Sequence, residues 1–244
     1  MIGHSKIKLI KPQSIFFDLD NTLYDYSKPH SIAEQSVKDK LISKLSITSD
    51  EFDRTLLDAK KDVKFNLKNT ASSHSRLLYF HRLLELLNLN SQVILALDLE
   101  ITYWRNFLSS AKLFEGVKDF LDELRVNDIP TVLITDLTAD IQFKKIIHFG
   151  LESYFDYVVT SEETGLDKPD KINFIKASNK VGVSNNIWMI GDNTEKDIMG
   201  AKRSINAITF QRINKKSDLN AKDLPDFSFT SFLQLKDYIK TIIK

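Results

Sequence analysis

Cysteine is absent from all 244 residues of the chain. This absence excludes disulfide bonds, thiolate nucleophiles and metal sites that depend on cysteine ligands. The 5 histidines are scattered, and no two of them have the spacing of a metal-binding pair. A metal site in this chain would therefore consist of oxygen ligands, which suits a hard cation such as Mg²⁺.

An excess of charge of either sign is also lacking, because 34 lysine and arginine residues are matched by 33 aspartate and glutamate residues. A net charge of +1 gives no electrostatic footprint for a nucleic acid polymer or an anionic membrane. No apolar run has the length of a transmembrane helix, and residues 1–13 do not have the pattern of a signal peptide. We therefore expect a cytoplasmic protein without a membrane or nucleic acid partner, either a monomer or a homodimer.

Glycine is missing from residue 4 to residue 115, and proline is missing between residues 29 and 130. Within this stretch apolar residues recur at helical spacing, as they do from Leu77 to Leu87. We expect an all-helical segment over residues 25–111, with Ser49 as the N-cap of its second helix. The predicted helices of this segment are 31–45, 50–66, 74–88 and 92–109.

The rest of the chain, 1–24 and 112–244, alternates short apolar runs with helical patterns. Such alternation predicts a parallel sheet with helices on both faces. The predicted strands are 14–17, 131–135, 157–160, 187–190, 207–210 and 226–230. The predicted helices are 117–126, 140–148, 171–180, 195–203 and 231–243. We therefore expect an α/β fold with a Rossmann-like core, interrupted after its first strand by the helical segment.

Polar residues follow several of the predicted strands, at the ends where ligands bind in open α/β sheets. These residues are Asp18, Asp20, Thr135, Asp136, Lys168, Asp192 and Asp197. Carboxylates that converge on one edge would repel each other unless a cation such as Mg²⁺ neutralised them. A lysine and a hydroxyl near that cation favour a phosphate. One carboxylate can then attack phosphorus, and a second can transfer protons for the leaving alcohol and for water.

Four motifs, in order, resemble those of the haloacid dehalogenase superfamily, specifically its phosphatase branch with a helical cap inserted after the first motif. They are Asp18-Leu19-Asp20-Asn21-Thr22, the strand-end Thr135, Lys168 in Gly165-Leu166-Asp167-Lys168-Pro169, and the acidic segment Gly191 to Asp197. The resemblance extends over essentially the whole chain. It implies a Mg²⁺-dependent hydrolase that acts through an aspartyl-phosphate.

By position, the resemblance implies a role for each residue of the acidic motifs. Asp18 would be the nucleophile, and Asp20 would be the general acid and base. Asp18 and Asp192 would bind Mg²⁺ through their side chains, and Asp20 through its backbone carbonyl. Dehalogenase members lack an aspartate at the position of Asp20, which a phosphatase needs to protonate its leaving alkoxide, so the phosphatase branch is favoured. Thr22, Asn193 and Asp197 would lie around these aspartates and hold them in place.

The resemblance also implies a phosphate site made of Thr135, Lys168 and the backbone N–H of Asp136. Family phosphatases often have asparagine where this chain has Asp136. An additional carboxylate beside an anionic substrate would cost affinity unless it is paired. Alternatively, Asp136 contacts a substrate hydroxyl or a basic residue of the cap.

The helical segment is expected to act as a mobile lid that excludes water from the site. We predict that its polar break, residues 69–76, faces the active site and that His74 or Arg76 contacts the substrate. The alternative is a solvated loop between two helices. A cap of this kind suits a small soluble phosphomonoester, and the resemblance is to nucleotidases and acylneuraminate-phosphate phosphatases. Nucleotide monophosphates and sugar phosphates are therefore both open as substrates.

Two other functions use similar residues. A phosphosugar mutase has the same four motifs but returns the phosphate to its substrate. A non-enzymatic phosphate-accepting signalling domain also presents clustered acids and a lysine at parallel strand ends. The spacing of Asp18, Asp20 and Thr22 and the large helical insert argue against the signalling domain. Taken alone, Asp18 and Asp20 could also be turn residues, because Asp-Asn is good turn chemistry.

Overall fold

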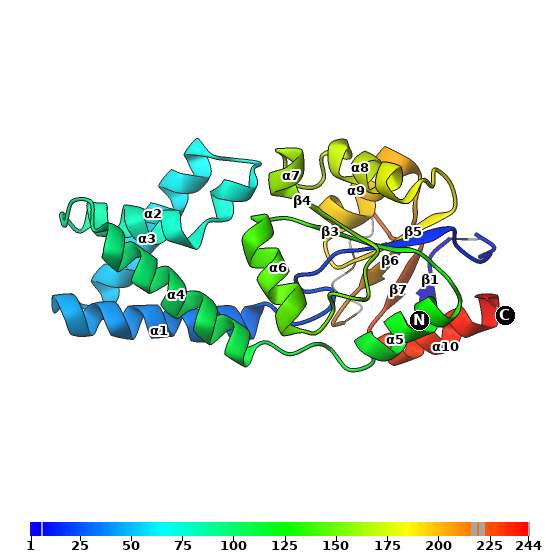
Figure 1. Cartoon of the computed structure of the whole chain (residues 1–244), viewed down its shortest axis with the longest axis horizontal. Helices are drawn as coiled ribbons and strands as arrows, with labels where there is room; N and C mark the ends of the chain where they lie inside the picture. Colours follow the sequence, from blue (N-terminus) through cyan, green and yellow to red (C-terminus); the bar gives the residue numbers. More distant parts are fainter. Residues whose placement is uncertain (6, 216–218, 220–222, 244) are drawn as a thin grey trace. The chain divides into compact units, whose positions relative to one another are not determined.

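The computed structural model describes residues 1–5, 7–215, 219 and 223–243, and the chain forms two compact units (Figure 1). The first unit comprises Met1–Asp25 and Lys112–Lys244. The second unit comprises Tyr26–Ala111. Each unit has a buried core of its own, so each is described separately below.

The first unit is built on a seven-stranded sheet with the order β1-β7-β6-β5-β2-β3-β4. Neighbouring strands from β4 to β7 pair in parallel, and β1 pairs with β7 in the antiparallel direction at one edge. The predicted α/β class is confirmed, although the short β1 was not predicted. The strands are β1 (Ile2–Gly3), β2 (Ser14–Phe17), β3 (Thr131–Thr135), β4 (Tyr157–Thr160), β5 (Ile187–Gly191), β6 (Ile208–Arg212) and β7 (Phe227–Phe229).

Strand β2 lies in the middle of the sheet, between β3 and β5, and all four of its residues are buried. Phe16 packs in a core that includes Val132 and Met189 from the neighbouring strands. The backbone N–H of Asp18 still donates to the carbonyl of Ile190 at 2.9 Å, so the chain keeps its alignment with β5 beyond the end of β2. The central position of β2 therefore places the Asp18 side chain at a well-fixed point of the sheet edge.

Helices cover both faces of this sheet. In Figure 1, α8 and α9 lie on one face and α5 and α10 on the other. The helices of this unit are α5 (Val117–Val126), α6 (Ala139–His148), α7 (Ser161–Thr164), α8 (Lys171–Val181), η2 (Thr194–Met199), α9 (Gly200–Ile205) and α10 (Phe232–Ile243).

The predicted helix 195–203 is divided into two parts, because η2 is a π-helical turn that precedes α9. The N–H of Ile198 donates to the carbonyl of Asn193, five residues earlier. The wide turn allows Asp197 to pack directly against Gly191, where a Cβ atom would lie 2.4 Å from the Asp197 Cβ. Gly191 is therefore required by this close approach, and periodicity alone could not have predicted the division.

The second unit consists of helices, as predicted for this part of the chain. Its core is apolar and includes Val37, Phe52, Leu83 and Leu99. No described helix in either unit is both long and apolar enough to cross a membrane. The elements are α1 (Ser27–Leu45), α2 (Ser49–Asn66), η1 (Ala71–His74), α3 (Arg76–Leu86) and α4 (Val93–Ser110).

One predicted cap in this unit is wrong. The N-cap of α2 is Thr48 rather than Ser49, because the Thr48 side chain accepts from the N–H of Glu51 at 3.1 Å. Thr48 has extended backbone angles, whereas Ser49 is already the first helical residue. Two adjacent hydroxyl residues fit the capping pattern equally well in the sequence, and the position of the turn decides between them.

Candidate active site

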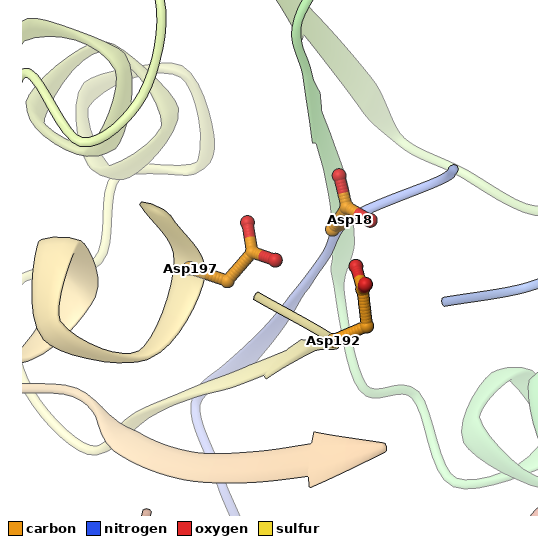
Figure 2. A group of neighbouring side chains, drawn as sticks. All are labelled: Asp18, Asp192 and Asp197. Carbon is orange, nitrogen blue, oxygen red and sulfur yellow. The ribbon is translucent and has the colours of Figure 1, made fainter. Parts of the chain in front are cut away.

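Three aspartates meet at the carboxyl ends of β2 and β5. Asp18 follows β2, Asp192 follows β5 and Asp197 lies in η2, and one oxygen of each lies within 4.8 Å of the others. Figure 2 shows the three carboxylates turned toward one another. Asp18 and Asp197 are buried, and Asp192 is half-buried. Sequence segments more than 170 residues apart thus contribute to one acidic cluster, which we call the aspartate cluster.

Lys168 is the buried cation in contact with the aspartate cluster. Its ammonium nitrogen lies 2.6 Å from Asp18 Oδ1 and 2.7 Å from Asp197 Oδ1, and it donates to the carbonyl of Ile134 at 3.0 Å. Its side chain is 2% exposed. Burial alone would lower the pKa of Lys168, but the charges of Asp18 and Asp197 raise that pKa well above its ordinary value. Lys168 is therefore protonated and holds two of the three aspartates in place.

One ammonium does not balance three carboxylates. Burial raises the pKa of Asp18 well above its ordinary value, and the charges of Asp197 and Asp192 raise it further against the opposing effect of Lys168. Burial and the charge of Asp197 raise the pKa of Asp192 to about 7. The protein groups alone therefore leave an excess of negative charge at this point of the sheet edge.

Thr22 and Asn193 support the two loops that carry the aspartates. The hydroxyl of Thr22 donates to Asp18 Oδ2 at 2.7 Å and lies 3.3 Å from Asp192 Oδ1. Asn193 accepts from two backbone N–H groups at the start of η2, and its own N–H donates to Asp197 Oδ2 at 3.0 Å. Thr22 therefore bridges two aspartates directly, whereas Asn193 acts as a helix cap that fixes Asp197.

Asp20 has different partners from the aspartate cluster. Lys145 of α6 donates to both carboxylate oxygens of Asp20 at 2.8 Å, and the hydroxyl of Tyr24 donates to Oδ1 at 2.5 Å. Burial would raise the pKa of Asp20, but Lys145 and these hydrogen bonds lower that pKa below its ordinary value. The two aspartates that flank Leu19 therefore lie in separate electrostatic surroundings.

The Asp136 carboxylate is paired within its own unit. Its Oδ2 lies 2.7 Å from the ammonium of Lys196, and its Oδ1 accepts from the backbone N–H of Lys168 at 2.9 Å. The charge that was expected to oppose an anionic substrate is thus offset by Lys196. Asp136, which directly follows β3, also fixes the loop between α7 and α8 that carries Lys168.

Three side chains of this region were missed by sequence reasoning: Gln142, Lys145 and Lys196. Gln142 donates to the hydroxyl of the buried Thr135 at 2.7 Å. Gln142 and Lys145 are one helical turn apart and face the interior of the unit, so helical periodicity was the available signal. The pairing of Lys196 with Asp136 had no signal in the sequence.

The two cap residues predicted to touch substrate lie in the helical unit. The guanidinium of Arg76 donates to the carbonyl of His74 at 2.5 Å and to the hydroxyl of Tyr26. The rings of Tyr103 and Trp104 lie 5.3 and 5.5 Å from this guanidinium. Among the described residues, no carboxylate forms an ion pair with Arg76. Contact of either residue with substrate stays a prediction.

Known proteins resemble this chain over most of its length. The family model described as haloacid dehalogenase-like hydrolase matches residues 12–204. A ribulose-1,5-bisphosphate 5-phosphatase of Halopiger xanaduensis is 34% identical over 194 residues, 77% of this chain and 80% of that protein. A glyceraldehyde 3-phosphate phosphatase of Methanopyrus kandleri is 28% identical over 95% of this chain and 99% of that protein.

A solved structure shows the same fold. The 2-haloacid dehalogenase of Pseudomonas syringae pv. Tomato aligns with a TM-score of 0.76 at 22% identity, over 96% of this chain and 99% of that chain. Identity at this level supports the fold, while the family match covers the segments that carry all of the acidic residues described above. The chain therefore belongs to the haloacid dehalogenase-like hydrolase family and is an enzyme of that family.

Proposed function

We propose that this protein is a Mg²⁺-dependent phosphatase that hydrolyses small soluble phosphomonoesters through an aspartyl-phosphate at Asp18. The observation that carries the proposal is that the Asp18 carboxylate meets Lys168 and two other aspartates at the ends of the parallel strands. Lys168 and Thr22 hold Asp18 in the aspartate cluster, whereas Lys145 holds Asp20 outside it. The protein groups alone raise the pKa of Asp18 and lower the pKa of Asp20. The roles of nucleophile and proton donor therefore require a cation that would keep Asp18 ionised, and a proton that Asp20 takes up beside the anionic phosphate.

The aspartate cluster fits a divalent cation. Three carboxylates against the one ammonium of Lys168 leave two negative charges, and all the donor atoms are oxygens of the kind that Mg²⁺ prefers. Asp18 and Asp192, with the backbone carbonyl of Asp20, would hold the ion. When bound, Mg²⁺ would offset the repulsion between the carboxylates and the phosphoryl oxygens. Asp197, which is already paired with Lys168, would support this arrangement.

The first chemical step would be carried out by Asp18 and Asp20. A carboxylate oxygen of Asp18 forms a bond to phosphorus as the bond from phosphorus to the ester oxygen breaks. Asp20 in its protonated form gives its proton to the leaving oxygen, and the alcohol departs. Thr135, Lys168 and the N–H of Asp136 would bind the phosphoryl oxygens during this transfer.

The second step would return the enzyme to its starting state. Asp20, now ionised, takes a proton from water while the water oxygen attacks phosphorus. The bond between Asp18 and phosphorus breaks, which releases phosphate and regenerates the Asp18 carboxylate. Asp20 ends this step protonated, so the two proton transfers balance.

The names of two relatives support sugar phosphates as the substrates. Two of them are named for phosphorylated sugars, ribulose-1,5-bisphosphate and glyceraldehyde 3-phosphate. We therefore favour sugar phosphates over nucleotide monophosphates. Phosphate release from a panel of both classes with Mg²⁺ tests this choice. Formation of an isomeric sugar phosphate without release of phosphate would instead identify a mutase. The absence of turnover for every ester would contradict the proposed phosphatase activity.

We also propose that residues 25–111 form a cap over the site and that the core consists of residues 1–24 and 112–244. A lid made of helices can exclude water during the reaction and release product when it opens. The surroundings of Arg76 support a role for this residue in substrate binding. Its guanidinium is surrounded by hydroxyls and aromatic rings rather than by a carboxylate.

Replacing Arg76 with alanine is expected to raise KM for sugar phosphates by about tenfold or more, because a hydrogen bond to a charged group contributes roughly 1.5–3 kcal/mol. Arg82→Ala is the matched control, since Arg82 lies on the same helix and pairs with Asp62 and Glu85. Steady-state kinetics over the panel, together with thermal melts of both variants, provide the measurement. Unchanged KM and kcat for every ester in Arg76→Ala would contradict the role of Arg76.

A further inference from the structure

We propose that Lys145 is a positioning residue, which orients the carboxylate of the proton-transfer group Asp20. Tyr24 contributes to the same orientation through its hydroxyl. The inference rests on the proposed function, because it assumes that Asp20 protonates the leaving group. It adds a residue of α6 that lies outside the four strand-end motifs. The argument depends on burial, on the geometry of the carboxylate and on a second contact made by the same helix.

The burial of Lys145 has a clear cost. Its side chain is 1% exposed, whereas the adjacent Lys144 is 56% exposed and pairs with Asp140 on the helix surface. Removing an ammonium from water costs several kcal/mol of solvation free energy unless a charged partner compensates for it. The partner is Asp20, which lies 125 residues earlier in the chain. A helix that needed only to pack against the sheet would not bury this charge.

The hydrogen bonds fix the direction of the Asp20 carboxylate. One ammonium that donates to both oxygens at 2.8 Å restrains rotation of the carboxylate, and the Tyr24 hydroxyl adds a third contact at 2.5 Å. The Asp20 side chain is still 25% exposed, so it is held without being sealed from a ligand. Lys145 and Tyr24 thus restrain the orientation of Asp20 while leaving it accessible.

The same helix supports the phosphate site. Gln142, one turn before Lys145, donates to the Thr135 hydroxyl at 2.7 Å and to the Asp136 carbonyl at 2.5 Å. Both Gln142 and Lys145 are buried. One face of α6 therefore aligns the proton-transfer group with the end of β3. Displacement of a reacting group by about 1 Å can cost a factor of about a hundred in rate.

Leaving-group dependence tests the positioning role. Lys145→Met is expected to lower kcat/KM for an alkyl phosphate about a hundredfold, because a poor leaving group needs the proton of a correctly oriented Asp20. This loss of orientation is expected to outweigh the easier protonation of Asp20, whose pKa Lys145 lowers. For para-nitrophenyl phosphate, whose leaving group needs little protonation, the expected loss is less than about fivefold. A purely structural defect would lower both rates by the same factor.

Three further variants complete the experiment. Lys144→Met is the matched surface control and should leave both rates unchanged. Lys145→Arg should recover part of the alkyl phosphate activity, because it restores the charge and the donors. If Lys145→Met does not fold, Tyr24→Phe removes one hydroxyl and should show a smaller loss with the same preference for the alkyl ester.

Equal losses for the two esters in a folded Lys145→Met, or no loss at all, would overturn the positioning role. The same result in Tyr24→Phe would overturn it where Lys145→Met cannot be folded. The proposed function is tested separately, by the turnover of the wild-type protein and of Asp18→Asn. Wild-type turnover that disappears in Asp18→Asn supports the proposed function whatever Lys145 does. A wild type that releases phosphate from neither of these esters nor from any ester of the substrate panel overturns the proposed function and this inference together.

Discussion

Asp18→Asn will remove phosphate release from every ester that the wild type hydrolyses, with a loss of at least about four orders of magnitude in kcat. A neutral amide oxygen cannot replace the carboxylate that attacks phosphorus. The protein should nevertheless remain folded. Burial and the neighbouring aspartates raise the pKa of Asp18, so its charge is a source of repulsion in the native state. Lys168 also keeps its contact with Asp197 in the variant.

The measurement for Asp18→Asn combines single-turnover phosphate release with a thermal melt. Asp140→Asn is the control, because Asp140 is exposed and pairs with Lys144 on the surface of α6. We expect the control to retain wild-type turnover. Substantial phosphate release by folded Asp18→Asn would show that another group attacks phosphorus.

Lys168→Met is expected to damage both stability and turnover. Removing the ammonium leaves Asp18 and Asp197 buried without their common partner. Breaking a buried ion pair by removing one partner costs about 3–5 kcal/mol of the free energy of unfolding. Turnover should fall by about a thousandfold or more, because the phosphoryl oxygens lose the same charge.

Mg²⁺ separates the electrostatic cause from a packing defect in this variant. If the aspartate cluster binds the cation, Mg²⁺ should raise the melting temperature of Lys168→Met more than that of the wild type. Lys176→Met is the matched control, since Lys176 pairs with Glu163 at the surface and should show no effect. A melting temperature of Lys168→Met equal to that of the wild type would contradict the account of Lys168.

The strand ends were predictable because each has a strong local pattern. Apolar runs end directly in polar residues at Asp18, Thr135 and Asp192, and parallel strands bring such ends to one edge. Both the α/β class and the family resemblance follow from these local signals and are confirmed. The individual roles of the site residues have not been tested and stay proposals.

The partners of these residues were not predictable, because they depend on distant segments. Lys145 occurs in a helix beside another lysine, and sequence alone gives no reason to pair it with Asp20. Asp136 was expected to oppose an anionic substrate, yet Lys196, 60 residues later, offsets its charge. The π-helical turn at η2 allows the contact of Asp197 with Gly191, and no periodic pattern in the sequence predicts it.

Trapping the covalent intermediate tests the central claim most directly. Asp20→Asn should still form the intermediate from para-nitrophenyl phosphate, whose leaving group needs little protonation, but should hydrolyse it slowly without the base. After an acid quench and digestion, mass spectrometry of the peptide that contains residues 14–24 should find one phosphoryl group on Asp18. A phosphoryl group on another residue, or none on a protein whose wild type turns over, would contradict the account.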